Sequence, residues 1–189
     1  MNIDTVFKVT TKERIIQYYI RSYERQRHYI YPACSKLAGK KVETNFTIID
    51  LKGGSSSILS PSVQGFVKIA SQICQDYYPE TLGMMYIVNV SWIIKAGWWV
   101  IKAFLDAKTV SKIHIKGSGF EKELLEHVPA ENLPSFLGGI CTCEPYGCIG
   151  TGTNPGPWSD VFAKLPKETD PEDVLCPPFF ERCGFELPQ

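Results

Sequence analysis

Three histidines are the first side chains in this sequence that could do chemistry, because histidine is the commonest general base. They are His28, His114 and His127. No G-x-S-x-G nucleophile elbow accompanies them. His114 falls in an expected strand and His127 ends an expected helix, so we interpret them as structural histidines. The sequence contains no other catalytic constellation, and we expect a protein that is not an enzyme.

Two further motifs suggest metal or nucleotide binding, and neither is complete. CTCEPYGC (141–148) has three cysteines, whereas a structural zinc site needs four ligands, usually in paired blocks. Cys176, Cys183 or a histidine would have to complete it, and the spacing does not require this. KGGSSS (52–57) follows an expected strand but lacks both G-x-x-x-x-G-K-[ST] and G-x-G-x-x-G. We therefore expect no metal and no cofactor.

Glu80, Thr109 and Lys112 lie at expected junctions between elements. Such polar residues are commonly solvated at the surface. They would gain importance if they converged inside a pocket, where an unpaired charge is costly. Periodicity alone does not show whether they converge.

The elements that would position these residues alternate along the chain. Helical spacing predicts helices over 12–38, 60–78, 92–105 and 119–128, and β-branched or continuous apolar runs predict strands over 44–51, 84–90 and 110–115. Gly39 is expected to end the first helix, and Pro61 to occupy the first turn of the second. This alternation predicts an α/β fold with a mainly parallel sheet.

The run WIIKAGWWVIKAFL (92–105) is the most apolar part of the chain. Fourteen helical residues span only about 21 Å, which is too short to cross about 30 Å of hydrocarbon. Lys95 and Lys102 are seven residues apart and form one narrow polar stripe. Such a helix is normally buried in a core, but it could also cover an apolar ligand or lie on a membrane surface.

Composition limits the remaining function classes. The 189 residues include 20 Lys+Arg and 20 Asp+Glu, so the formal net charge is zero. A balanced charge argues against nucleic acid as the main partner. The amino terminus begins polar, without the apolar segment of a signal peptide. We therefore expect a cytosolic chain whose seven cysteines are reduced.

Four runs, taken in order, change this interpretation. They are VETNFTIIDLKG (42–53), YYPETLGMMYIVNV (77–90), FLDAKTVSKIHIKGSGFEKELLEHVPAENLPSFLGG (104–139) and TNPGPWSD (153–160). Together they resemble the CRAL-TRIO lipid-binding domain of the phosphatidylinositol/phosphatidylcholine transfer proteins. The resemblance covers residues from about 10 to about 160. It implies an α/β sheet with helices around an apolar cavity that holds one phospholipid.

The resemblance also gives the run 92–105 a role as a mobile gate. Such a gate lines the acyl chains when it is closed and meets the membrane when lipid is exchanged. The gate residues implied here are Trp92, Ile94, Trp98, Trp99, Ile101, Phe104 and Leu105. Tryptophan suits this role, because its amphipathic ring is favoured at the membrane interface.

The resemblance assigns headgroup roles residue by residue. By this resemblance, the inositol phosphate is bound by Glu80 of YYPE and by Thr109 and Lys112 of TVSKI. A compact lysine cation beside phosphate is physically reasonable. By the same resemblance, the phosphatidylcholine headgroup is bound by Tyr23, Asn45 and Thr47.

Two positions depart from the family pattern. Asn45 replaces a hydroxyl residue of the choline-lipid site, and Thr81 replaces a basic residue that the nearest relatives carry after YYPE. Phosphatidylinositol binding is therefore better supported than phosphatidylcholine binding. The expected domain is 1–160, without the family's N-terminal helical domain and first strand, and 161–189 is expected to be a C-terminal tail.

The implied function is phospholipid binding and exchange between membranes, in the cytoplasm and peripherally at Golgi or other endomembranes. The implied partners are the phospholipid and a transient membrane surface. Two alternatives remain open. The chain could be a lipid sensor that presents lipid to a phosphoinositide kinase without net transfer, or it could bind another hydrophobic ligand such as a sterol, tocopherol or retinoid.

Overall fold

In the computed structural model, residues 9–54 and 56–141 are described. A long helical segment opens this part of the chain and runs through α2 (Lys12–Arg25), a π-helical turn (Gln26–Ile30) and α3 (Tyr31–Ala38). Thr11 caps its start, and Gly39 ends it with a left-handed φ of 63°. The predicted helix 12–38 is confirmed.

The π-helical turn was not predicted, although the sequence contains its cause. Pro32 has no N–H, and its ring conflicts with the carbonyl one turn earlier in a regular α-helix. The wider turn avoids this conflict, because the Tyr31 N–H donates to the carbonyl of Gln26, five residues earlier. Such turns often occur at functional sites, and this one carries Gln26 to the cavity described below.

Three parallel strands form the described sheet in the order β1 (Asn45–Asp50), β2 (Leu82–Val88) and β3 (Ile113–Ile115). Helix α4 (Pro61–Tyr77) connects β1 to β2, and α5 (Trp92–Lys102) with α6 (Ala107–Ser111) connects β2 to β3. Helix α7 (Glu121–His127) follows β3. The predicted α/β fold with a parallel sheet is confirmed. Short 3₁₀ turns occupy Ser56–Leu59, Ala130–Asn132 and Ser135–Leu137.

The prediction of a strand over 110–115 was wrong in its first half. Residues up to Ser111 belong to α6, Lys112 caps that helix, and β3 begins at Ile113. Asp106 caps the helix start, where its carboxylate accepts from the Thr109 N–H at 2.9 Å. This local capping outweighs the β propensity of Thr109 and Val110. Helix α5 also ends before the predicted 105, so Phe104 and Leu105 follow it in a turn.

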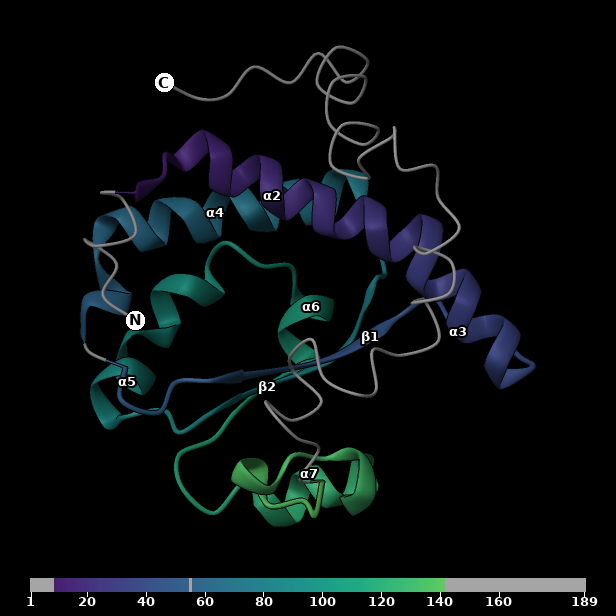
Figure 1. The fold of residues 1–189 in the computed structure, drawn as a ribbon. Helices are drawn as coiled ribbons and strands as arrows, with labels where there is room; N and C mark the ends of the chain where they lie inside the picture. The colour runs from purple at the N-terminus through teal and green to yellow at the C-terminus, as the bar shows by residue number, and fades with distance from the viewer. Residues whose placement is uncertain (1–8, 55, 142–189) are drawn as a thin grey trace.

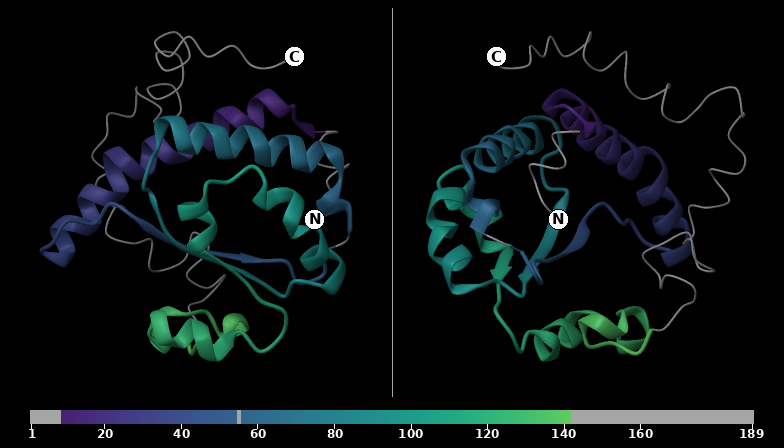
Figure 2. Two further views of the ribbon diagram at one scale, coloured as in Figure 1. Left: turned by 180° about the vertical axis from the view of Figure 1, so that it is seen from behind. Right: turned by 60° about the vertical axis from the view of Figure 1, so that its left-hand side comes forward.

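The two faces of the sheet pack differently. In Figure 1, α2 and α4 lie on one side of the sheet and α7 lies on the other. The α7 side holds an apolar core of six buried residues: Tyr86, Val88, Phe120, Leu124, Leu133 and Leu137. A second apolar cluster joins α2 to α4, and its buried members are Ile16, Ile20, Ile73 and Tyr78. Figure 2 shows that α2 and α4 form a layer separated from the sheet, and that the α5–α6 segment lies at one side, between this layer and the sheet.

Two glycines allow a stability test of this arrangement. A Cβ at Gly139 would lie 1.8 Å from the backbone oxygen of Leu133, whereas a Cβ at Gly65 in α4 meets nothing within 4 Å. We expect Gly139→Ala to destabilise the chain by about 2–4 kcal/mol, because backbone must move. The matched Gly65→Ala is expected to stabilise it by about 0.5–1 kcal/mol. Thermal unfolding measures both changes, and a neutral Gly139→Ala would contradict the described close approach.

The predicted domain boundary at residue 160 and the tail 161–189 lie outside the described residues. Of the cluster CTCEPYGC, only Cys141 is described, and it is not in a disulfide. Among residues 9–54 and 56–141, no helix is long and apolar enough to cross a bilayer.

Candidate functional site

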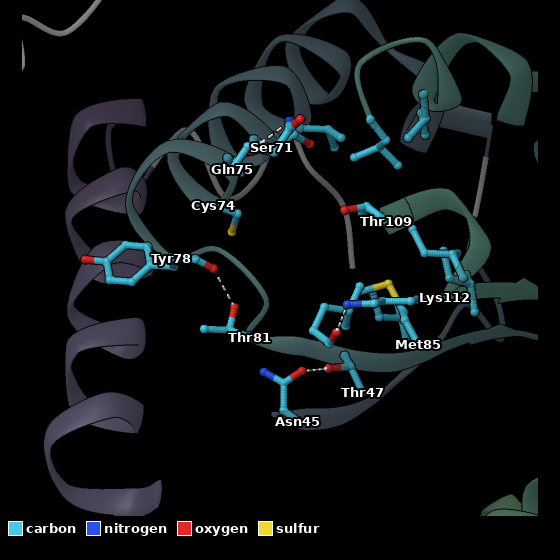
Figure 3. A pocket seen from close by; sticks show the side chains of 18 of the residues that line it. Asn45, Thr47, Ser71, Cys74, Gln75, Tyr78, Thr81, Met85, Thr109 and Lys112 are labelled. Carbon is cyan, nitrogen blue, oxygen red and sulfur yellow. Dashed lines mark hydrogen bonds between the residues drawn. The ribbon is translucent and has the colours of Figure 1, made fainter. Parts of the chain in front are cut away.

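A cavity of about 820 Å³ lies between the sheet, α2, α4 and α5. Its size falls in the range of small-molecule pockets, roughly 300–1,000 Å³. Most of its lining is apolar, and the aliphatic or aromatic side chains come from every surrounding element, including Ile49, Ile87, Ile115, Phe66, Val67, Ile94 and Trp98. Figure 3 shows the opposite character at one end, where Asn45, Thr47, Thr109 and Lys112 are directed into the same space.

Strand register explains why the cavity is polar at one end and apolar at the other. Residues 45, 47, 49 and 51 of the β1 segment line it, and they read Asn, Thr, Ile, Leu. Thr47 pairs with Met85, and Ile49 pairs with Ile87. The polar residues are therefore at the amino ends of the parallel strands and the apolar residues are toward the carboxyl ends, within a row that spans about 20 Å from residue 45 to residue 51.

The three residues assigned to an inositol phosphate meet at the polar end. The Lys112 ammonium donates to the Glu80 carboxylate at 3.2 Å and to the Leu82 carbonyl at 2.7 Å. Lys108, which the sequence analysis did not identify, bonds the other oxygen of the same carboxylate. The two ammonium groups hold the pKa of Glu80 below its usual range, with Lys108 the larger cause.

Thr109 lines the same end of the cavity from α6. Its hydroxyl donates to the second carboxylate oxygen of Asp106, while its N–H donates to the first. These bonds hold the pKa of Asp106 below its usual range. The capped first turn fixes α6, and so fixes where Lys108 and Lys112 emerge.

The second predicted group, Tyr23, Asn45 and Thr47, also lines the cavity. Thr47 donates to the Asn45 side-chain oxygen at 3.2 Å. The Asn45 amide donates to Gln26 at 3.2 Å, so the π-helical turn and β1 are tied by side chains. The Tyr23 hydroxyl lies 3.4 Å from that of Tyr19.

A tyrosine–cysteine pair continues this wall toward α4. The Tyr19 hydroxyl lies 3.0 Å from the sulfur of Cys74. Burial is the main cause that raises the pKa of both Tyr19 and Tyr23 above the usual range. Both phenols are therefore neutral near pH 7 and are available as hydrogen-bond donors.

The seven predicted gate residues divide by direction. Ile94, Trp98, Ile101 and Leu105 line the cavity. Trp92 and Trp99 instead face outward and are 79% and 73% exposed. Phe104 is half-buried and is not among the described lining residues. One face of α5 therefore covers the cavity, while its outer face presents two large indole rings.

Sequence reasoning missed Lys108, Gln26, Tyr19 and Cys74. Helical spacing contained a signal for Gln26, because it follows Tyr23 by three residues in the predicted helix 12–38. Lys108 gave no such signal, because Lys112 was predicted to lie in a strand. Tyr19 lies in the predicted helix 12–38, and nothing in that pattern distinguished it from its neighbours. Cys74 gave no signal, because a single cysteine within a helix resembles any small apolar residue.

The histidines lie away from this site. Among the described residues that line the cavity there is no histidine. His28 lies 3.1 Å from Glu24 on the same helix. His114 stacks on Tyr86 on the far face of the sheet, and His127 lies near the same ring. Within residues 9–54 and 56–141, no group of three His, Cys, Asp or Glu side chains is arranged to hold a metal ion.

Comparison with known sequences decides the family. The sequence profile of the CRAL/TRIO domain matches residues 2–139. The chain belongs to the CRAL/TRIO domain family. This CRAL/TRIO chain is 46% identical over 162 residues to a protein named Sec14 cytosolic factor from Schizosaccharomyces pombe, and the match covers 84% of this chain and 55% of that protein.

Two further relatives extend the comparison. A SEC14 cytosolic factor from Yarrowia lipolytica is 44% identical, with 85% of this chain and 32% of that protein covered. The phosphatidylinositol/phosphatidylcholine transfer protein SFH11 from Arabidopsis thaliana is 39% identical, with 92% and 46% covered. This CRAL/TRIO chain thus spans about half, or less, of the length of these three relatives.

One solved structure, titled "Crystal structure of Sfh5", is also similar to this CRAL/TRIO chain. It is 28% identical, covers 52% of this chain and 34% of its own, and superposes with a TM-score of 0.43.

Proposed function

We propose that this chain binds one phospholipid in the cavity and exchanges it between membranes. The observation that carries the proposal is the polarity of the cavity, which runs from charged and amide groups at the strand starts to aliphatic side chains at the strand ends. A phospholipid has the same division. Burial of its acyl chains contributes about 0.8 kcal/mol per CH₂, so the apolar end supplies most of the affinity.

The polar end of the cavity would determine which phospholipid headgroup is bound. Lys112 is positioned to contact a lipid phosphate, and Thr109 and Glu80 offer hydroxyl and carboxylate groups to an inositol ring. Phosphatidylinositol is therefore the proposed ligand. Phosphatidylcholine is the second proposed ligand, with Tyr23, Asn45 and Thr47 at its headgroup. The names of the curated relatives, which are phosphatidylinositol/phosphatidylcholine transfer proteins and Sec14 cytosolic factors, support this assignment.

Helix α5 is proposed as the gate. Its inner face would line the acyl chains, and its outer tryptophans would enter the membrane interface when the helix moves outward. The membrane contact would be transient. No bond is made or broken in this cycle, so no catalytic residue and no cofactor is proposed. We place the activity in the cytoplasm, peripherally at Golgi or other endomembranes.

Transfer between vesicles tests the function. Donor vesicles carry labelled phosphatidylinositol or phosphatidylcholine, and acceptor vesicles carry neither. We expect the chain to speed transfer of both lipids, and of phosphatidylinositol more. Stable binding without transfer would favour the sensor that presents lipid to a phosphoinositide kinase.

A triple variant distinguishes phospholipid binding from binding of another hydrophobic ligand. Replacing Glu80, Thr109 and Lys112 together by Gln, Val and Met removes the charges and the hydroxyl but keeps their approximate volume. We expect phosphatidylinositol binding to be lost. Unchanged affinity for the bound ligand would instead indicate a sterol, tocopherol or retinoid held by the apolar walls alone.

A further inference from the structure

Lys108 is a charged residue at the cavity that the proposed function has not yet used. It emerges from α6 four residues before Lys112, and both ammonium groups reach the carboxylate of Glu80, 28 and 32 residues earlier in the chain. Each lysine takes a different carboxylate oxygen. All three residues line the cavity.

Two lysines four residues apart on a helix repel each other unless an anion lies between them. Glu80 supplies that anion, although it lies in a different element and is 60% exposed. Its backbone is held at φ 62°, in the left-handed region that a non-glycine residue seldom adopts. The strained backbone of Glu80 holds its carboxylate between Lys108 and Lys112. Such backbone outliers cluster at functional sites.

The two lysines differ in their surroundings. Lys112 is 22% exposed and is anchored to the Leu82 carbonyl, whereas Lys108 is 65% exposed and bonds Glu80. An exposed ion pair contributes little to the stability of a fold. Lys108 is therefore free to exchange Glu80 for a better anion at little cost to the fold.

We propose that Lys108 and Lys112 form a two-lysine clamp for the phosphate of an inositol phospholipid, in which Glu80 is the resident anion when no lipid is bound. The clamp rests on the proposed function and adds Lys108 to Lys112 as a residue that sets the lipid preference. Both unesterified oxygens of a phosphodiester accept charge-assisted hydrogen bonds, so one phosphate can take the place of the carboxylate between the two ammonium groups.

The clamp discriminates between the two proposed lipids by charge. An inositol headgroup is neutral apart from its phosphate, and its hydroxyls can donate to Glu80 once the lysines release it. A choline headgroup carries a fixed positive charge, which two nearby ammonium groups repel. Thr81, the residue after Glu80, contributes no charge to this end of the cavity. Its hydroxyl donates to the Tyr78 carbonyl at 2.9 Å. Lys108 therefore raises phosphatidylinositol occupancy relative to phosphatidylcholine.

The test is competitive loading of the full chain. Chain and vesicles containing equal amounts of phosphatidylinositol and phosphatidylcholine are incubated and separated, and native mass spectrometry then counts each bound lipid. We expect Lys108→Met to lower the bound phosphatidylinositol:phosphatidylcholine ratio about tenfold, the low end of the range for a hydrogen bond between a charged donor and a charged acceptor. Lys108→Arg keeps the cation and should retain most of the ratio.

Lys122→Met, an exposed lysine on α7 beyond the opposite face of the sheet, is the control and should leave the ratio unchanged. An unchanged ratio in Lys108→Met, with wild type loading normally and Lys112→Met losing phosphatidylinositol, would overturn the clamp but leave the proposed function intact. Failure of the wild-type chain to load either lipid would overturn both.

Discussion

Lys112→Met should reduce phosphatidylinositol transfer about ten- to hundredfold, which is the loss expected for a charge-assisted hydrogen bond of roughly 1.5–3 kcal/mol. Phosphatidylcholine transfer should fall far less. Lys112 is the more buried of the two lysines at the polar end, and its ammonium is fixed by the Leu82 carbonyl. Methionine keeps the length of the side chain and removes its charge. Vesicle transfer of each labelled lipid measures the difference.

Lys116→Met is a matched control for that result. Lys112 immediately precedes β3, and Lys116 immediately follows it. Lys116 is 33% exposed and bonds Glu123 at 2.7 Å. It is not among the described lining residues of the cavity. We expect it to leave both transfer rates within about twofold, the scale of a surface ion pair. Equal loss of both lipids in Lys112→Met would show that Lys112 acts through the fold rather than through the headgroup.

Val67→Trp is expected to abolish most phospholipid loading without unfolding the chain. Val67 lines the cavity from α4, about 16 Å along the helix from Tyr78 at the polar end. An indole there would occupy the space of about three methylenes or more, at about 0.8 kcal/mol each, which corresponds to a loss of roughly fiftyfold in affinity. Lipid extraction from the purified variant, with circular dichroism of the same sample, measures loading and folding together.

Lys68→Trp is the control for this variant, because Lys68 is the next residue on α4, is exposed and is not among the described lining residues. It introduces the same side chain outside the cavity and should load lipid as wild type does. Normal loading of Val67→Trp would mean that acyl chains do not occupy the cavity, and the proposed function would then have lost its main support.

The alternating elements were predictable because each carries its own local signal. Pro61 begins α4, Gly39 ends α3, and the apolar runs give β1 and β2. The boundary at α6 was not predicted, because the β-branched residues Thr109 and Val110 fit the start of a strand as well as a capped turn after Asp106. In the structure, the hydrogen bonds from the Thr109 N–H and hydroxyl to the Asp106 carboxylate define the capped turn.

The candidate site was predictable only in part. The resemblance supplied Glu80, Thr109 and Lys112, and they do meet at one end of the cavity. Lys108 could not be assigned from spacing, because a lysine four residues before another on a short helix is usually a solvated surface residue. Its contact with Glu80 depends on how the turn before β2 approaches α6, which is a tertiary feature.

The location of the polar end also required the structure. Ligands in open α/β sheets usually bind beyond the carboxyl ends of the strands. Here the polar groups lie at the amino ends, because residues 45 and 47 are polar, whereas 49 and 51 in the same cavity-facing row are aliphatic. The sequence shows this row, but only the register with Met85 and Ile87 shows that it forms a cavity wall with the neighbouring strand.

The most direct test of the whole account is native mass spectrometry of the purified full chain, with lipid extraction from the same sample. The account predicts one phospholipid per chain, mainly phosphatidylinositol, with phosphatidylcholine as the minor species. A folded chain that carries no phospholipid, and takes none from vesicles of either lipid, would contradict it.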